Sequence, residues 1–380
     1  MRAALIAFAT STALTASTLA LVGSPAEGRA VAPAARAVQS ASLTVSPGIA
    51  QNGSRVASAN SALVVGAATF RPAKAGRLVT VQRRLGASGT WTTVTKGREA
   101  ANGVYRFKAA RASGGTPYTY RVVAARTSGL ARVVTDEVSS EAWELQFDEP
   151  FSGTRLDQNK WSYRNLGIRQ GSRLRSQSST RAVHVSSGAL KLEVRRHPTR
   201  RNNYLNGTIG TSGKFSYTYG YAAARMKFAK GRGQHGAFWM QPQVQASRYG
   251  TPAKTGAEID VAEFFGKGYS DGGLAHFLYS YPRKGTTTKH GDVFRRASTA
   301  LAGKSDTWWS RYHVFSVQWT PSGYVFRIDG TETWRSSKAV SKQPEYLILS
   351  QLTSDWELKY LDRSTLPTSL KVDWVRVWQR

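Results

Sequence analysis

Short runs of alternating apolar and polar residues fill most of the chain from about residue 43 to the C-terminus. In the first part, "RLVTVQRRL" and "TWTTVTK" are separated only by "GASG". Alternation with a period of two is typical of half-buried β-strands, and the short glycine-containing link is typical of a hairpin. No long stretch carries the three-to-four-residue period of an amphipathic helix. The pattern therefore predicts an all-β protein.

The runs divide into two groups. Residues 43–138 contain about seven short strands, which predicts a β-sandwich like that of immunoglobulin or fibronectin type III modules, preceded by a linker at residues 31–42. Residues 143–380 continue with "ALKLEVRR", "YHVFSVQW" and "LKVDWVRVW", which predict a second, larger domain of two packed antiparallel sheets. This second domain holds all but one of the 11 tryptophans.

The N-terminal residues 1–30 have the composition of a secretory signal peptide. Arg2 precedes a long apolar run, and small residues and a proline follow it. A signal anchor is the alternative, because the run approaches the length that spans a bilayer. The threonines and serines in the run favour cleavage. We therefore expect a secreted, extracellular protein with no membrane attachment after cleavage, and a monomer, since no signature of self-association is visible.

The amino-acid composition limits the kinds of site that the chain can form. The chain has no cysteine, so disulfides and thiolate metal sites are excluded. The net charge is +30, and basic residues exceed acidic ones in both predicted domains. Such a surface favours polyanions, for example an acidic polysaccharide or an anionic cell-wall polymer, although a general preference for arginine would give the same count. No nucleic-acid-binding module accompanies the charge, so a specific nucleic-acid partner is not expected.

Three of the 23 acidic residues lie close together in "GAEIDVAEFFG", residues 256–266. Glu258 and Asp260 share one face of a strand, whereas Glu263 is one residue out of phase. A β-bulge near Val261–Ala262 would return Glu263 to that face. The two glutamate backbones would then lie on the order of 13 Å apart. Side chains that lean toward each other could approach to roughly 5 Å, the carboxylate separation of a retaining glycosidase.

Such a trio permits double displacement, in which one carboxylate attacks the anomeric carbon and another transfers the proton. The middle aspartate could share a proton and raise the pKa of its neighbours. Two other interpretations stay open at this point: a bound cation and a set of structural hydrogen bonds. The apolar strand residues around the acids are unlike the loops that usually bind calcium.

The same residues carry a family resemblance. E-I-D-x-x-E on a strand resembles the active-site motif of glycoside hydrolase family 16 in its bulged, laminarinase-like form. "FDEPFSGTRLDQNKW", "GTIGTSGKFSYTYGYAAARMKF" and "GAFW" resemble segments that precede the motif, and "YHVFSVQWTPSGYVFRIDG", "PEYLILSQL" and "KVDWVRVWQ" resemble later strands. The resemblance implies a concanavalin-like β-jelly roll, with Glu258 as nucleophile, Glu263 as general acid/base and Asp260 as their assistant.

The resemblance also implies residues around the acids. Trp239 of "GAFWM" and His276 of "LAHFLY" would contact the substrate. The chain reads "GQHGAFW" where many members have a tryptophan and a proline, so that His235 stands at the place of a sugar-stacking ring. Glu149 and Asp373 would hold a structural calcium ion, and no organic cofactor is expected.

The predicted function is therefore a secreted endo-β-glycanase that acts on a polysaccharide by a retaining mechanism. The glycan would be a β-1,3- or mixed-linkage glucan or, given the basic residues Arg248, Lys254, Arg283 and Lys284 in flanking loops, an acidic glycan. A transglycosylase with the same residues, and a non-catalytic glycan- or cell-wall-binding protein, are the alternatives.

Overall fold

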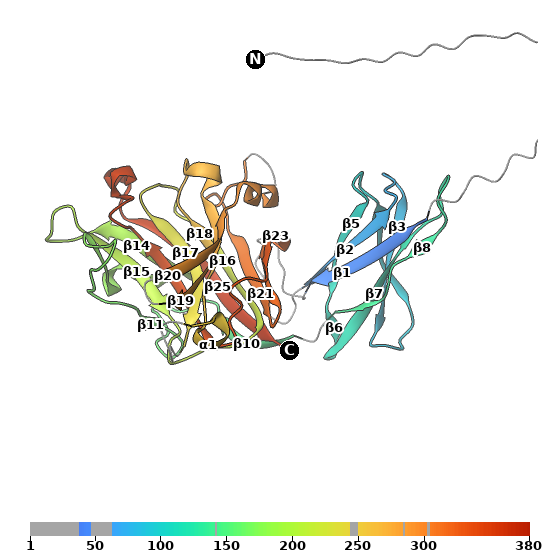
Figure 1. Ribbon diagram of the computed structural model, residues 1–380, viewed down its shortest axis with the longest axis horizontal. Helices are drawn as coiled ribbons and strands as arrows, with labels where there is room; N and C mark the ends of the chain where they lie inside the picture. Colours follow the sequence, from blue (N-terminus) through green and yellow to red (C-terminus); the bar gives the residue numbers. More distant parts are fainter. Residues whose placement is uncertain (1–37, 47–62, 141–142, 244–249, 284–285, 302–304) are drawn as a thin grey trace, which may run out of the picture. The chain divides into compact units, whose positions relative to one another are not determined.

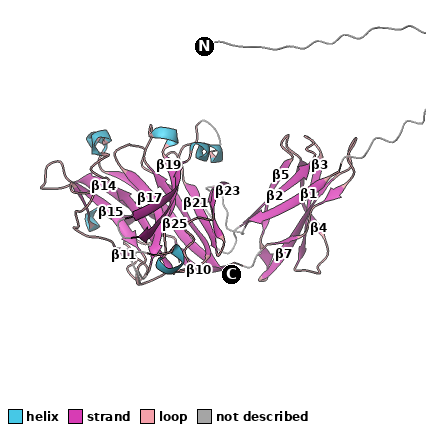
Figure 2. Cartoon of the chain, in the orientation of Figure 1, coloured by secondary structure: helices cyan, strands magenta, loops and turns pink. Residues whose placement is uncertain are grey.

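The structure, a computed structural model, describes residues 38–46, 63–140, 143–243, 250–283, 286–301 and 305–380 (Figure 1). The predicted signal peptide lies outside these residues. The regular elements in them are strands, apart from helical turns of three to six residues (Figure 2). These turns are α1 (Pro252–Thr255) and the 3-10 turns η2 (Thr180–Ala182), η3 (Ser270–Gly272), η4 (Arg295–Ala300), η5 (Leu358–Tyr360) and η6 (Arg363–Thr365). The all-β prediction is confirmed. None of the helices in the described ranges has the length and apolarity to cross a bilayer.

The first domain consists of two antiparallel sheets. One has the order β1-β2-β5, and the other has the order β4-β3-β7 with β6, β8 and β9 also paired to β7. Alternate residues of both sheets, among them Val64, Phe70, Val81 and Tyr120, share one apolar core, so the domain is a sandwich. The strands are β1 (Ser40–Ser46), β2 (Leu63–Arg71), β3 (Leu78–Leu85), β4 (Thr92–Arg98), β5 (Val104–Ala110), β6 (Ala112–Ser113), β7 (Thr116–Ala124), β8 (Val133–Val134) and β9 (Val138–Ser139). Strand β1 begins at Ser40, before the predicted end of the linker.

The second domain is built on one continuous, mainly antiparallel sheet. Its order is β20-β19-β18-β17-β24-β15-β14-β25-β16-β21-β22-β23, and β10, β11, β12 and β13 pair at its sides. The first strands are β10 (Glu144–Glu149), β11 (Ser162–Tyr163), β12 (Ser176–Ser178), β13 (Val183–Ser186), β14 (Ala189–Arg196), β15 (Tyr204–Gly210), β16 (Gly220–Lys227) and β17 (His235–Pro242). The later strands are β18 (Glu258–Phe264), β19 (Leu274–Arg283), β20 (Thr286–Val293), β21 (His313–Thr320), β22 (Gly323–Ile328), β23 (Thr331–Ser336), β24 (Glu345–Leu352) and β25 (Thr368–Gln379).

Strand β15 is the point at which this sheet divides into two layers. Its first residues pair with β14, and its last residues pair with β24. Apolar side chains of both halves then meet in one core, in which Ile259 of β18 and Phe238 of β17 join Phe315 of β21 and Val375 of β25. The domain is therefore a two-layered sandwich, as the jelly-roll prediction requires. Since β17, β18 and β24 bury one face in the core, their other face is left for the site described below.

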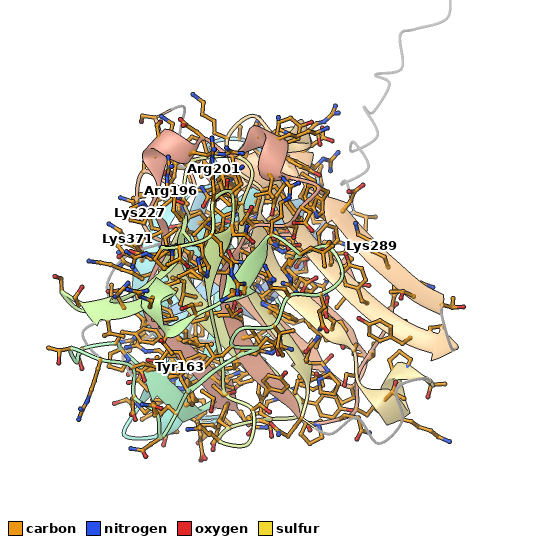
Figure 3. The ribbon with its side chains drawn as sticks, turned by 90° about the vertical axis from the view of Figure 1, so that its left-hand side faces the viewer. Tyr163, Arg196, Arg201, Lys227, Lys289 and Lys371 are labelled. Atoms are coloured by element: carbon orange, nitrogen blue, oxygen red, sulfur yellow. The ribbon has the colours of Figure 1, made fainter. Side chains whose placement is uncertain are left out.

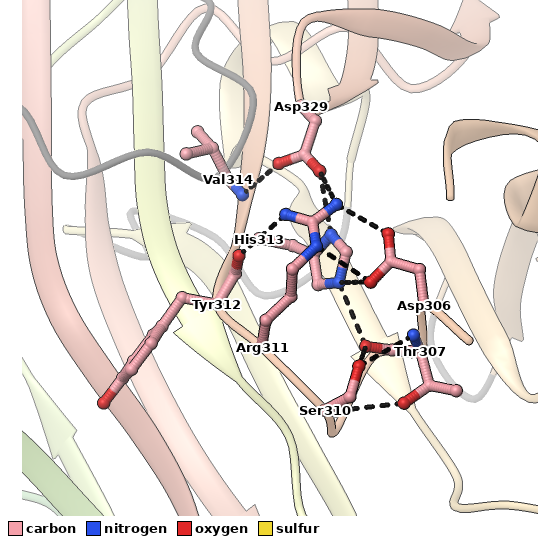
Figure 4. Close-up of polar contacts among 8 residues, drawn as sticks. All are labelled: Asp306, Thr307, Ser310, Arg311, Tyr312, His313, Val314 and Asp329. Carbon is pink, nitrogen blue, oxygen red and sulfur yellow. Dashed lines mark hydrogen bonds and ion pairs between the residues drawn. The ribbon is translucent and has the colours of Figure 1, made fainter. Parts of the chain in front are cut away.

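A polar cluster fixes the segment that leads into β21 (Figure 4). The buried ring of His313 bonds through Nδ1 to Asp329 at 2.8 Å and through Nε2 to the carbonyl oxygen of Thr307 at 3.0 Å. Arg311 donates to both oxygens of Asp306, at 2.8 and 2.6 Å, and contacts Asp329 at 3.3 Å. Paired in this way, the buried charges tie the turn before β21 to the end of β22.

Candidate active site

Strand β18 is bulged at its centre. Pairing with β19 is regular up to Asp260 and resumes only at Glu263, so that Val261 and Ala262 oppose a single residue. Both Val261 and Ala262 are fully buried in the core. Because two successive residues face the core, Glu258, Asp260 and Glu263 all project from the opposite face. The bulge that the phase of Glu263 predicts is thus present in the structure.

The face with the three acids lines a cavity of about 360 Å³. Strand β17 contributes every second residue, namely His235, Ala237, Trp239 and Gln241. Strand β24, β19 and the segment 164–173 supply the remaining walls, through residues that include Ser350, Tyr279, Arg164 and Arg173. Gly236 points the other way, where a Cβ atom would lie 2.7 Å from Oε1 of Gln351 and 2.9 Å from the ring of Phe228, so a larger residue would have to displace these side chains.

Glu258 is held by an amide and lies near two guanidinium groups. Nε2 of Gln241 donates to Oε2 of Glu258 at 2.8 Å, and Oε1 of Gln241 accepts from Nη2 of Arg164 at 2.6 Å. Burial raises the pKa of Glu258, while the Gln241 hydrogen bond and the charges of Arg164 and Arg173 act in the lowering direction. Burial outweighs these contacts and leaves the pKa of Glu258 raised, but each contact favours the ionised form that a nucleophile needs.

Glu263 has a different environment. Its Oε1 atom lies 3.7 Å from Nε2 of His235, and Nδ1 of the same ring lies 2.8 Å from Oε1 of Glu357. Burial raises the pKa of Glu263, and the charge of Glu258 adds to this rise, whereas the charge of His235 opposes it. A carboxyl group with a raised pKa is suited to donate a proton near neutral pH.

Asp260 is the most strongly perturbed of the three acids. Burial raises the pKa of Asp260 well above its ordinary range, and the charges of Glu258 and Glu263 raise it further. With two carboxylates as neighbours, Asp260 therefore holds its proton most firmly. A neutral middle acid reduces the repulsion between the other two and can share its proton with either.

Comparison with known families agrees with this site. A family described as "Glycosyl hydrolases family 16" matches residues 170–376, which is more than half of the chain and includes the whole of β18. The chain belongs to glycosyl hydrolases family 16. The family that the E-I-D-x-x-E motif indicates is thereby confirmed.

Three proteins that are related to this chain in sequence are named as glycosidases. Glucan endo-1,3-beta-glucosidase A1 of Niallia circulans is 28% identical over 268 residues, which are 62% of this chain and 38% of that protein. Beta-glucanase of Rhodothermus marinus is 27% identical over 264 residues, 62% of this chain and 85% of that protein. Keratan-sulfate endo-1,4-beta-galactosidase of Sphingobacterium multivorum is 28% identical over 256 residues, 64% of this chain and 56% of that protein. The chain thus spans only about two fifths to just over half of the length of two of them.

Solved structures of the family share the fold. The endo-beta-1,3-glucanase of Pyrococcus furiosus superimposes with a TM-score of 0.51 at 22% identity and covers 63% of this chain and 95% of its own. The laminarinase of Rhodothermus marinus gives a TM-score of 0.50 at 23% identity, with 62% and 97% covered. At this identity the likeness establishes the jelly-roll architecture of the family 16 domain and no finer property.

Trp239 lies in the cavity, where its sequence position predicts it. The ring is partly exposed, and its Nε1 atom donates to Oγ of Ser350 at 3.1 Å. The guanidinium carbon of Arg164 lies 5.1 Å from the centre of the ring. The guanidinium group of Arg164 therefore lies within the distance of a cation–π contact with the indole.

The prediction that His276 binds substrate is wrong. His276 has no exposed surface and lies on the core side of β19, in phase with the core residue Leu278. Its Nδ1 atom is 2.7 Å from the carbonyl oxygen of Val261, and its Nε2 atom is 2.9 Å from Oγ1 of Thr333. The carbonyl oxygen is an acceptor, so the ring donates from Nδ1 and holds the bulge from behind. Burial lowers the pKa of His276 to about 4, which keeps the ring neutral.

The calcium site predicted at Glu149 and Asp373 stays a prediction, and in this structure both carboxylates contact other residues of the protein. The Oδ2 atom of Asp373 lies 2.7 Å from Nη1 of Arg225, and Glu149 faces Lys160 at 3.7 Å and accepts from the amide of Phe151 at 2.7 Å. A cation beside Asp373 would be repelled by the guanidinium group. Among the described residues no group of three or more acidic or histidine side chains could hold a metal ion.

Several residues of the site escape sequence reasoning. Arg164 and Arg173 come from an irregular segment, and Glu357 comes from the turn after β24, so their distance along the chain from β18 hides their proximity. Gln241 could have been predicted to line the cavity, because it is two residues from Trp239 and shares its face of β17. Of the predicted basic residues, Arg248 and Lys284 lie outside the described residues, the side chain of Arg283 is not described, and Lys254 is exposed on α1.

Three lysine side chains on the strands of this domain add positive charge, one near the cavity and two away from it. Lys289 of β20 places Nζ 3.9 Å from the centre of the Phe277 ring, and its charge acts on Asp260 and Glu263. Away from the cavity, Lys371 of β25 is directly opposite Lys227 of β16 (Figure 3). Opposed like charges destabilise a sheet unless water or an anion separates them.

Proposed function

We propose that this chain is a secreted, endo-acting β-glycanase that cleaves a polysaccharide by retaining double displacement. The observation that supports the proposal most strongly is the bulge of β18, which brings Glu258, Asp260 and Glu263 to one wall of a cavity. Regular alternation would place Glu263 on the other face of the strand. Secretion rests on the composition of residues 1–30 alone.

In the first step, the carboxylate of Glu258 attacks the anomeric carbon while Glu263 donates its proton to the glycosidic oxygen, so that the leaving sugar departs as an alcohol. The amide of Gln241 holds one oxygen of Glu258 and thereby orients the carboxylate. In the second step, Glu263 takes a proton from water, and the resulting hydroxide replaces Glu258 at the same carbon. Two inversions give overall retention.

The proposed substrate class is supported by the cavity walls and by the names of the relatives. Two relatives are named as glucanases, and the third is named for keratan sulfate, a sulfated glycan. Arg173 lines the cavity, where the charges of Glu258 and Glu357 act on its guanidinium group. We therefore place a β-glucan or an acidic β-glycan in the cavity, with Arg173 as the group that would bind an anionic or hydroxyl substituent.

The proposal is tested with a panel of β-1,3-glucan, mixed-linkage glucan, sulfated galactan and bacterial wall glycan. The wild type should release oligosaccharides from at least one of them, and Glu258→Gln and Glu263→Gln should lose most of that activity. Glu332→Gln, which neutralises an exposed glutamate on β23, serves as the matched control. NMR of the first product should show the β-anomer. A wild type that cleaves none of the panel, or an active Glu258→Gln variant, contradicts the proposal.

Azide separates the roles of the two glutamates when the substrate has a good leaving group. In Glu258→Ala, azide can enter from the vacated side and should give the inverted, α-linked glycosyl azide. In Glu263→Ala, azide should intercept the covalent intermediate and give the retained, β-linked product. The reverse pattern would exchange the two assignments. Products longer than the substrate would indicate transfer to sugar rather than to water.

A further inference from the structure

His235 lies between two carboxyl groups at the edge of the cavity. Its Nδ1 atom is 2.8 Å from Oε1 of Glu357, and its Nε2 atom is 3.7 Å from Oε1 of Glu263. The imidazole and Glu357 are both buried, with 8% and 2% of their surface exposed. The chain Glu357–His235–Glu263 therefore links a buried carboxylate, through an imidazole, to the acid/base that the mechanism uses.

The fold holds the linked side chains of Glu357 and His235 rigidly. His235 is the first residue of β17 and is paired with Leu352 of β24. Its ring stacks on Trp356, with 6.4 Å between centroids and an interplanar angle of 16°. Glu357 is fixed by the backbone amide of Ser354, which donates to its Oε1 atom at 2.7 Å. Neither side chain can turn away from the other without breaking these contacts.

We infer that Glu357 and His235 are positioning residues for Glu263, and that His235 acts as a fixed cation which controls when Glu263 releases its proton. This inference rests on the proposed role of Glu263 as acid/base. It gives His235 a function through Glu263, in place of the direct contact with substrate that its sequence position suggests.

The protonation state follows from the partners of the ring. A neutral imidazole can donate from one nitrogen only, whereas both nitrogens of His235 face carboxylate oxygens. Burial lowers the pKa of His235, but the charge and hydrogen bond of Glu357, with the charge of Glu263, outweigh burial and leave the pKa raised. The ring is therefore held as an imidazolium ion in the acid-to-neutral range.

Other charged groups act on the same pair from each neighbouring element. Arg173, from the segment before β12, lowers the pKa of His235. Glu258 and Glu357 raise the pKa of Glu263, and Lys289 of β20 lowers it. Of these groups, His235 has the largest effect on Glu263 after burial. Removing the imidazolium charge should therefore let the pKa of Glu263 rise.

The consequence concerns the first chemical step. When Glu263 gives its proton to the glycosidic oxygen, it becomes a carboxylate beside an imidazolium ion. The cation stabilises the charge that develops on Glu263 and so promotes proton release. Without the imidazolium ion, Glu263 would stay protonated to higher pH, but it would give its proton to the glycosidic oxygen less readily.

The test compares wild type with His235→Gln across pH. The basic limb of kcat/KM should move up by about 1 pH unit in the variant, because an opposite charge at this distance has been removed from Glu263. His184→Gln is the matched control, since exposed His184 contacts Glu193 at 3.5 Å outside the cavity, and its profile should equal that of wild type. An unmoved basic limb in a folded His235→Gln variant overturns the inference.

A second measurement does not depend on substrate. Nitrogen-15 NMR of the six histidines, with His235 assigned by its loss in His235→Gln, should show that its pKa falls by about 1 unit or more in Glu357→Gln. An unchanged pKa there overturns the inference as well. If wild type cleaves no glycan, the proposed function fails, while this titration still tests the pairing of Glu357 with His235.

Discussion

The side-chain amide nitrogen of Gln241 lies 2.8 Å from Oε2 of Glu258, across the gap between β17 and β18. Gln241 is itself held by Arg164, which donates to its Oε1 atom at 2.6 Å. The amide can therefore offer only its nitrogen to Glu258. This contact fixes both the direction and the charge of the proposed nucleophile, and it can be tested separately from Glu258.

Replacing Gln241 by Met should keep the volume and remove the hydrogen bond. A hydrogen bond to a charged group is worth roughly 1.5–3 kcal/mol, so kcat/KM should fall about 10- to 100-fold. The pKa of Glu258 should rise, which moves the acidic limb of the pH profile upward, because the bond stabilises the ionised form. Gln243→Met, at an exposed amide on the surface, is the control and should change neither quantity.

His276→Leu should destabilise the fold at neutral pH. The substitution leaves the carbonyl oxygen of Val261 without its donor in a buried position, which costs about 1–3 kcal/mol in the free energy of unfolding. Glycan cleavage should fall further than the loss of folded protein explains, because the bulge positions Glu263. A variant with full activity per folded molecule would show that the bulge needs no support from His276.

The stability contributed by neutral His276 should disappear in acid. The folded protein holds the pKa of His276 near 4, whereas the ordinary value is 6.5. The unfolded chain therefore binds a proton that the folded protein does not, and this contribution is complete above pH 6.5 and is lost as the pH falls toward 4. The loss amounts to about 3 kcal/mol. Denaturant unfolding should thus show a smaller difference between wild type and His276→Leu at pH 4.5 than at pH 7.

Glu345→Gln should stabilise the protein in mild alkali. Glu345 is fully buried on β24, its Oε1 atom accepts from the amide of Ala257 at 3.1 Å, and burial raises its pKa to about 8. Because the folded pKa lies above the unfolded one, the wild type loses stability as the pH rises from about 4.5 to 8. Glutamine does not ionise, so the variant should gain about 5 kcal/mol at pH 8.5 and little at pH 4.5. Equal urea midpoints at both pH values would refute this, and Glu332→Gln is the exposed control.

Arg173→Gln should discriminate between substrate classes. If the guanidinium group binds an anionic substituent, KM for a sulfated or carboxylated glycan should rise about tenfold or more, while KM for a neutral glucan changes little. For the wild type, KM on the anionic glycan should also rise with salt. Arg295→Gln removes an exposed arginine on η4 and is the control. Equal effects on charged and neutral glycans would assign Arg173 to sugar hydroxyls instead.

The strands and the acid trio could be predicted because both depend on local periodicity. "ALKLEVRR" forms β14 with Leu190, Leu192 and Val194 inside, as its alternation requires. The bulge was predictable because a regular strand cannot place Glu258 and Glu263 on one face.

The partners of the trio could not be predicted, because they depend on tertiary contacts. Glu357 meets His235 across 122 positions, and Arg164 meets Gln241 across 77. His276 is the opposite case, since its motif suggests the cavity while its phase on β19 assigns it to the core. For the location of His276, its phase along the strand was a better predictor than its motif.

The bulge also bears on how this active site can change through mutation of its gene. Loss of the single codon for Ala262 would leave E-I-D-V-E, in which all three acids still share a face and Phe264 still points inward. The spacing between the outer carboxyl groups would stay at about four strand residues, because Glu258 and Glu263 already lie opposite Tyr279 and Ala275, four residues apart on β19. The extra residue of the bulge can therefore be lost in one in-frame deletion with the nucleophile and the proton donor left the same distance apart.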